Sequence, residues 1–186
     1  PDRYAHYRQG VFEELAKKYD VTLAASFFLD KNNIRLADQG LYLQGENWID
    51  LKDHFYRNAC IWQSGLLKII ISQEYDVLII WGDAWRITTW LSVIISKLRR
   101  KKIILWTHGL YGHENHIRKK IRLTLYKLAD HIFTYGNFAK QLLLDNSISH
   151  KSITVVSNSI MFNDKFSTKL RNKKIKLYKS NKFLSI

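Results

Sequence analysis

The hydrophobic pattern of this chain switches repeatedly between the spacing of amphipathic helices and short, continuous apolar runs. In the stretch HYRQGVFEELAKKYD, residues 6–20, Tyr7, Val11, Phe12 and Leu15 fall on one helical face. The same spacing predicts further helices over 58–74, 85–98, 115–129 and 138–145. Apolar runs predict strands over 21–28, 77–81, 103–106, 131–134 and 153–156, with a short strand at 41–43 in the less regular segment 29–57.

The predicted strands have the composition of strands that are buried on both faces. Sequences such as DVLIIW, KIILWT and ITVVS lack the alternation of polar and apolar residues that a half-exposed sheet shows. Such strands are typical of a parallel sheet that helices cover on both faces and that right-handed crossovers connect. The pattern therefore predicts an α/β chain with a Rossmann-like, doubly wound, mostly parallel sheet.

Polar residues and glycines follow the predicted strands at the point where each strand ends. Ligands of doubly wound sheets bind beyond the carboxyl ends of the strands, so these residues are candidates for a site. They are Gly82, Asp83 and Trp85; Thr107, His108 and Gly109; Tyr135, Gly136 and Asn137; and Ser157, Asn158 and Ser159. His108 either faces a cleft or bonds a loop carbonyl, and its position alone leaves both roles open.

The composition limits the class of protein. With 186 residues, 46% of them hydrophobic, the chain can build one sizeable core. Its single cysteine, Cys60, excludes an internal disulfide and offers no cysteine-rich metal site, so we expect a cytoplasmic, metal-free protein with Cys60 as a small buried side chain. Every apolar run is far shorter than the roughly 20 residues that span a bilayer, so we expect no transmembrane segment.

A strong positive charge favours anionic partners. The chain carries 30 Lys and Arg against 16 Asp and Glu, a formal net charge of +14. We do not expect nucleic acid as the partner, because no helix-turn-helix, OB-fold or RNA-recognition pattern occurs. The sequence also lacks the Gly-x-Gly-x-x-Gly and Gly-x4-Gly-Lys-Ser/Thr strings of dinucleotide-binding and P-loop domains.

The predicted helix 115–129 is strongly basic. Its expected core-facing residues are Ile117, Ile121, Leu125 and Leu128. Its cations are Arg118, Lys119, Lys120, Arg122 and Lys127. Leu123 and Tyr126 fall among these cations, and such a mixture is typical of helices at anionic membrane surfaces. A plain solvated face is the alternative.

Five stretches, in order, resemble the N-terminal domain of family 4 glycosyltransferases, which is one half of the GT-B fold. HYRQGVFEELAKKYDVTLAAS is similar to the first helix and second strand of the family, and YDVLIIWGD to the strand that opens its second half. KKIILWTHGLYG is similar to the strand with the cleft histidine, ADHIFTYGNFAKQLLL to a later strand and helix, and ITVVSNSI to the end of the domain. The resemblance covers residues 1–162, which leaves 163–186 as a basic linker and the start of a C-terminal domain.

The resemblance implies that this half binds the acceptor, a glycan or a lipid-linked molecule, beside an anionic membrane surface. A separate domain would bind the nucleotide-sugar, which is a co-substrate, and no cofactor is implied. His108 would orient the substrates as the catalytic residue. The implied acceptor contacts are His6, Tyr7, Arg8, Asp83, Arg86, Thr107, Gly109, Tyr135, Asn137 and Asn158. Alternatively, Asp83 caps the next helix.

The chain departs from the family pattern in three places. It opens inside the expected first loop, so the first strand would be missing, and Met161 stands where the family has aspartate. No pair of glutamates has the Glu-x7-Glu spacing of the donor-binding domain. We therefore expect a hexosyltransferase of polysaccharide or lipopolysaccharide synthesis in which this polypeptide alone is inactive. The alternative is a basic α/β domain that binds anionic lipid head groups without catalysis.

Overall fold

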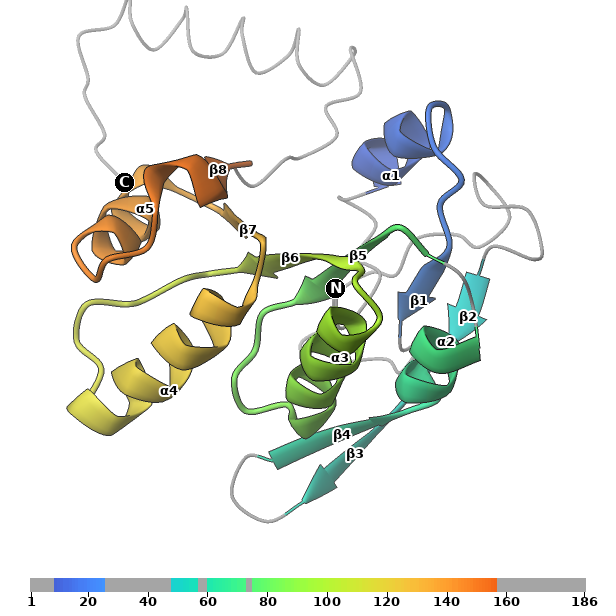
Figure 1. The fold of residues 1–186 in the computed structure, drawn as a ribbon, viewed down its shortest axis with the longest axis horizontal. Helices are drawn as coiled ribbons and strands as arrows, with labels where there is room; N and C mark the ends of the chain where they lie inside the picture. Colours follow the sequence, from blue (N-terminus) through green and yellow to red (C-terminus); the bar gives the residue numbers. More distant parts are fainter. Residues whose placement is uncertain (1–8, 26–47, 57–59, 73–74, 157–186) are drawn as a thin grey trace, which may run out of the picture.

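A computed structural model describes residues 9–25, 48–56, 60–72 and 75–156 of the chain (Figure 1). The candidate acceptor contacts His6, Tyr7, Arg8 and Asn158 lie outside these residues. The strand predicted at 41–43, Met161 and the boundary expected after residue 162 also lie outside them. These expectations stay predictions.

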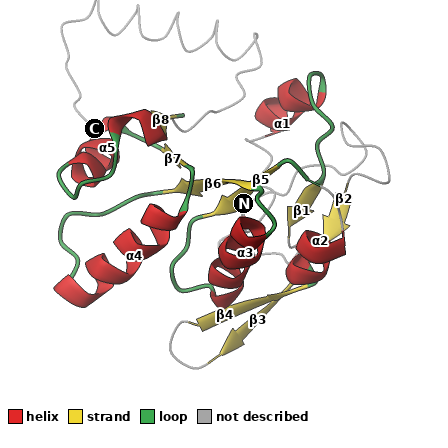
Figure 2. Ribbon diagram, viewed as in Figure 1, coloured by secondary structure: helices red, strands yellow, loops and turns green. Residues whose placement is uncertain are grey.

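A four-stranded parallel sheet forms the centre of the fold. Its strands are β5 (Val77–Trp81), β6 (Lys102–Thr107), β7 (His131–Thr134) and β8 (Ile153–Val155), side by side in that order (Figure 2). Two shorter strands, β1 (Leu23–Ala25) and β2 (Trp48–Asp50), also pair in parallel. The predicted α/β fold with a mostly parallel, Rossmann-like sheet is therefore confirmed.

Helices cover both faces of this sheet. They are α1 (Gln9–Ala16), α2 (Leu66–Ser72), α3 (Ile87–Leu98), α4 (His116–Leu128) and α5 (Asn137–Leu144), and a short 3-10 helix, His150–Ser152, precedes β8. Successive side chains of a strand point to opposite faces, so Ile103 and Leu105 join one core with buried residues of α2 to α5. Trp106 points the other way and packs with Phe12 of α1, which Figure 1 shows across the sheet from α3 and α4.

The prediction of a helix over 58–74 is wrong for the first half of that segment. Residues Cys60–Ser64 form β4, which pairs antiparallel with β3 (Lys52–Tyr56), and only the short helix α2 follows. Gly65 separates strand from helix at a φ of +93°, a left-handed conformation that favours glycine. Cys60, which was expected to be buried, is exposed on this hairpin.

None of the helices in the described ranges is long and apolar enough to cross a membrane.

Candidate functional site

His108 lies at the carboxyl edge of the central sheet, one residue beyond β6. Its imidazole is exposed and packs between aromatic rings from the two neighbouring strand ends. The ring centroid of Tyr135, after β7, is 4.6 Å away, and that of Trp81, at the end of β5, is 5.4 Å away in an edge-to-face arrangement. The sequence placed these residues at strand ends, and the parallel register brings them together.

The aromatic layer continues beneath His108 along the same face of the sheet. Trp106, 7% exposed, lies 6.1 Å from Tyr135 and 6.3 Å from Phe133 between ring centroids. Phe12 of α1 closes the layer 6.4 Å from Trp106. Tilted and edge-to-face pairs at these separations are favourable for aromatic rings. His108 therefore stands on a packed aromatic support.

Thr107 joins the ends of β5 and β6 below the exposed surface. Its side chain is 3% exposed, and its hydroxyl donates to the carbonyl of Gly82 at 3.1 Å. The backbone N–H of Gly109 donates to the same hydroxyl oxygen at 3.1 Å. A Cβ at Gly82 would come within 2.9 Å of the Thr107 Cβ, so the two strand ends meet only because residue 82 lacks a side chain. Thr107 therefore fixes, from the buried side, the backbone at the start of the loop that follows β6.

The carbonyl of Gly109 is the meeting point of two donors from α4. Tyr126 donates its hydroxyl to this carbonyl at 3.2 Å, and Arg122 donates from Nη1 at 3.0 Å. Gly109 adopts a φ of +74°, and a Cβ there would lie 3.0 Å from the Cβ of Ala139. The chain can make this turn beside α5 because residue 109 is glycine.

Arg122 was predicted to lie among surface cations, and this placement is wrong. Its guanidinium is partly buried and lies 4.5 Å from the ring centroid of Tyr111, in addition to its bond to Gly109. Tyr126, which was placed on the same outer face, is 1% exposed. Ile117, which was expected to be in the core, is 70% exposed. The buried face of α4 is thus rotated toward Arg122 and Tyr126.

Glu114 holds the far end of the loop between β6 and α4, residues 108–115, which we call the histidine loop. Its carboxylate accepts from the backbone N–H groups of Tyr111 at 2.7 Å and Gly112 at 3.0 Å. Burial works against its ionised form, but these bonds and the charge of Arg122 outweigh burial and lower the pKa of Glu114. Burial likewise opposes the charged form of Arg122, yet contacts with Tyr126, Tyr111 and Glu114 raise its pKa. Burial raises the pKa of Tyr126, so this residue stays a neutral donor.

The sequence did not indicate the roles that Arg122 and Glu114 have in this region: Arg122 was expected on an outer cationic face, and Glu114 was not a candidate site residue. Their signal was present in the spacing: Arg122 and Tyr126 are four residues apart, so they share one face of a helix. Glu114 is the only acidic residue between Asp83 and Asp130. A lone carboxylate directly before a basic helix can act as a local partner for backbone N–H groups.

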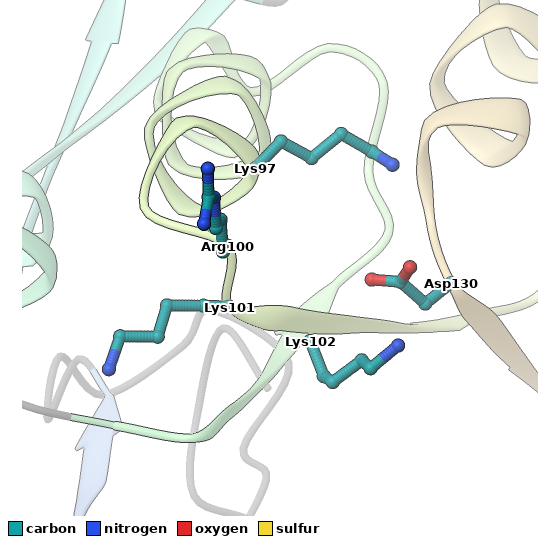
Figure 3. Close-up of a pocket in the computed structure, with 5 residues that line it drawn as sticks. All are labelled: Lys97, Arg100, Lys101, Lys102 and Asp130. Atoms are coloured by element: carbon teal, nitrogen blue, oxygen red, sulfur yellow. The ribbon is translucent and has the colours of Figure 1, made fainter.

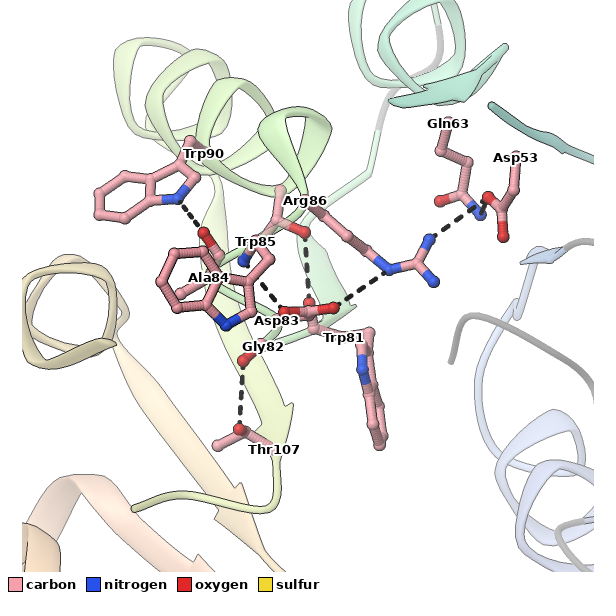
Figure 4. Close-up of polar contacts among 11 residues, drawn as sticks. Asp53, Gln63, Trp81, Gly82, Asp83, Ala84, Trp85, Arg86, Trp90 and Thr107 are labelled. Atoms are coloured by element: carbon pink, nitrogen blue, oxygen red, sulfur yellow. Dashed lines mark hydrogen bonds and ion pairs between the residues drawn. The ribbon is translucent and has the colours of Figure 1, made fainter. Parts of the chain in front are cut away.

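Asp83 and Arg86 belong to a polar network beside the end of β5 (Figure 4). Arg86, whose side chain is 6% exposed, lies 3.3 Å from Asp53 of β3 and 3.6 Å from Asp83 in two ion pairs. Gln63 of β4 donates to Asp53 at 3.0 Å. Asp83 accepts from the backbone N–H of Trp85 and does not cap α3, whose N-cap is Arg86, so the capping alternative is wrong. The network ties the hairpin to this strand end.

The remaining candidates lie at the start of α5 or along the outside of α4. Gly136 is the N-cap of α5 and has no side chain that could cap the helix. Asn137, the first residue of the helix, is exposed. On α4, Lys120 and Lys127 are exposed, and Arg118 lies 5.7 Å from the ring of Trp85. No group of three or more His, Cys, Asp or Glu side chains within the described ranges could hold a metal ion.

The geometry offers an exposed imidazole between two half-buried aromatic rings at the carboxyl edge of the sheet. An imidazole can donate or accept a hydrogen bond at a ligand oxygen. Such sites position polar ligands and stabilise charge that develops on oxygen.

The sequence profile of glycosyltransferase family 4 matches residues 10–161. No curated protein matches the chain. Enzymes of a glycosyltransferase family act on a sugar donor and an acceptor. Because the matched region spans most of the 186 residues and holds the whole central sheet with His108, the protein belongs to glycosyltransferase family 4 and carries the N-terminal type of domain.

Proposed function

We propose that this chain is the acceptor-binding half of a glycosyltransferase that moves a sugar from a nucleotide-sugar to a glycan or lipid-linked acceptor. The supporting observation is the exposed His108 between Trp81 and Tyr135 at the carboxyl edge of the parallel sheet. Ligands of open α/β sheets bind at that edge. The match to the family profile supports the transferase chemistry.

In this proposal His108 is the catalytic residue that orients the substrates. Its ring donates a hydrogen bond to a sugar oxygen next to the reacting carbon, beside the phosphate group on which negative charge develops as the bond to the sugar breaks. Tyr135 and Trp81 hold the imidazole plane through their ring contacts. Arg122 is a positioning residue, because it acts on the loop through the Gly109 carbonyl.

The acceptor would lie along the rim formed by the strand ends and the start of α5. Tyr135 and Asn137 would contact it directly, while Thr107 and Gly109 fix the backbone that carries His108. Arg86 is 5% exposed and engaged by Asp53, so its part is to hold Asp83 in place at the rim. The roles of His6, Tyr7, Arg8 and Asn158 remain predictions.

The donor would be a hexose nucleotide whose main contacts lie outside these residues, since the sequence holds no Glu-x7-Glu pair. For the same reason we propose that this polypeptide alone does not transfer sugar. We propose a cytoplasmic location at the inner face of the cell membrane, in polysaccharide or lipopolysaccharide synthesis, because the chain has one cysteine and a net charge of +14.

The test is binding of the whole chain to an array of immobilised oligosaccharides and lipid-linked sugar phosphates. We expect retention of a subset of these probes, and we expect His108→Gln to abolish it. The variant should still unfold in one cooperative thermal transition, lowered by no more than the loss of the two ring contacts of His108 explains. Lys127→Gln, exposed at the far end of α4, is the matched control and should bind normally. Retention that is equal in the wild type and His108→Gln would overturn the proposed site.

A further inference from the structure

A dense run of cations joins the end of α3 to the start of β6. It comprises Lys97, Arg99, Arg100, Lys101 and Lys102. Residues 84–113, which include all of α3 and β6, contain no Asp or Glu. None of these five cations forms an ion pair with another residue in the described part of the chain. Like charges this close together repel one another, and a bound anion would relieve that repulsion.

The end of α3 itself requires only a small part of this charge. The dipole of a helix presents roughly half a negative charge at its C-terminal end, which one nearby cation offsets. Lys97 lies in the last turn of α3 and can serve in that way, whereas Lys101 and Lys102 follow the helix end. The positive charge of the run therefore exceeds what the helix end needs.

Most of these cations line a single hollow. A space of about 260 Å³ at the end of α3 and the starts of β6 and β7 is lined by Lys97, Arg100, Lys101, Lys102 and Asp130. In Figure 3, Lys97 and Lys102 extend on the side of Asp130, and Lys101 extends on the other side. The carboxylate of Asp130 accepts from the backbone N–H of Ile103 at 2.8 Å and so serves the backbone. We call this space the cationic hollow.

Arg100 occupies a backbone position that favours glycine. Its φ is +57°, in the left-handed region, and it directly follows Arg99, the C-cap of α3. The N–H of Arg100 donates to the Lys97 carbonyl at 2.9 Å, and the N–H of Lys101 donates to the Ser96 carbonyl at 2.8 Å, which is the Schellman pattern of a helix end. Glycine is the usual residue there, because a Cβ is unfavourable in this conformation. An arginine at such a position places a guanidinium at the hollow although glycine would fit the backbone better, and strained residues of this kind cluster at binding sites.

We propose that the cationic hollow binds a soluble anion with two or more linked phosphate groups, the class to which pyrophosphate belongs. Four cations and one carboxylate give its lining a formal charge of +3. A single phosphate group carries about 1.5 to 2 negative charges at neutral pH, so two linked phosphates match the lining better than one. Cations on both sides of the start of β6 also suit an elongated anion, and the guanidinium of Arg100 can bind phosphate oxygens in pairs.

The cationic hollow lies at the opposite edge of the sheet from His108. Lys102 begins β6, and His108 follows its end. At about 3.3 Å per residue of strand, the two positions are about 20 Å apart. One small ligand cannot touch both, so binding at the hollow does not depend on the proposed sugar transfer.

Isothermal titration calorimetry of the whole chain with sodium pyrophosphate, without vesicles, sugar donor or divalent cations, tests the proposal. We expect one pyrophosphate per chain, bound roughly tenfold more tightly than inorganic phosphate and less tightly as salt rises. Pyrophosphate at about one hundred times its dissociation constant should raise the midpoint of thermal unfolding by about 5–10 °C. Equal affinity for the two anions would overturn the proposal. Binding to phosphatidylglycerol vesicles without any response to pyrophosphate would overturn it as well.

The run of cations supplies its own matched control. Lys97→Gln with Lys102→Gln, both at the hollow, should weaken pyrophosphate binding roughly tenfold. Arg99→Gln removes an exposed cation of the same run that does not line the hollow, and it should weaken binding by less than about threefold. Equal losses would mean that pyrophosphate senses only the net charge, and the site would be refuted.

Arg100→Gly separates binding from stability. It should weaken pyrophosphate binding roughly tenfold and raise the midpoint of thermal unfolding by about 2–4 °C, because glycine relieves the left-handed residue. Unchanged binding with a lowered midpoint would show that Arg100 serves only the helix end, against the proposal. His108→Gln should bind pyrophosphate like the wild type, and a loss in that variant would place the anion at the carboxyl edge of the sheet instead of the hollow.

Discussion

Replacing Arg122 by methionine tests how the histidine loop is held. Methionine keeps much of the side-chain stem but loses the donor to the Gly109 carbonyl, 3.0 Å away, and the charge over the Tyr111 ring, 4.5 Å away. A hydrogen bond from a charged group is worth about 1.5–3 kcal/mol, and a partly desolvated cation–π contact about 1 kcal/mol. These two losses add to about 2.5–4 kcal/mol. Because the stem packing remains and Tyr126 still donates to the Gly109 carbonyl, we expect the free energy of unfolding to fall by an amount near the lower end, roughly 2–3 kcal/mol.

Urea unfolding, followed by tryptophan fluorescence, measures this loss. Trp81 and Trp106, two of the six tryptophans, lie in the central sheet, so the fluorescence change reports unfolding of the fold that carries the loop. Hydrogen exchange adds a local readout: the amides of Gly109, Tyr111 and Gly112 should exchange faster in the variant, because each is bonded inside the loop.

Two comparisons make the result decisive. Lys127→Met, exposed on the same helix, should change the free energy by less than about 0.5 kcal/mol. Arg122→Lys should recover part of the loss, since it keeps the charge but not the planar fork. A loss below about 0.5 kcal/mol in Arg122→Met, together with unchanged exchange of the loop amides, would refute the account of Arg122 as the residue that holds the loop.

Three further changes test separate contacts. The lowered pKa of Glu114 means that its ionised form stabilises the fold above its unfolded pKa and that this contribution is lost as pH falls through the folded pKa. Glu114→Gln should therefore flatten the acid limb of a stability–pH curve, and an unchanged limb would contradict the assignment. Gly82→Ala should cost about 1–3 kcal/mol in urea unfolding, because the new Cβ would lie 2.9 Å from the Thr107 Cβ. Asp53→Asn should cost about 3 kcal/mol by removing the charge of one of the two carboxylates that pair with the Arg86 guanidinium, 6% exposed, whereas Asp20→Asn at an exposed position serves as the control; equal losses would count against the buried pair.

The central sheet could be predicted from the sequence because its signals are local. Each of β5 to β8 is a short apolar run followed by turn residues, and the edge that joins His108 to Tyr135 follows once those runs are taken as parallel. The antiparallel hairpin was missed for the opposite reason. Residues of β4 have a helix-compatible spacing, and only their pairing with β3 makes them a strand.

The candidate site was predictable in its strand-end residues but not in their support. A helical wheel places the apolar stripe of α4 on Ile117, whereas the fold buries Tyr126 and partly buries Arg122, because the Gly109 carbonyl offers these polar groups a partner. Burial of a charged side chain depends on an acceptor that tertiary structure supplies, and local periodicity carries no information about it.

The two hydrogen bonds that the Gly109 carbonyl accepts, from Arg122 and Tyr126, affect the thermodynamics of binding for any ligand at this loop. Because Arg122 and Tyr126 fix this peptide before a ligand arrives, binding at His108 requires no folding of the loop. The heat-capacity change on binding should then reflect only the surface that the ligand itself covers, and association should proceed without a slow rearrangement step.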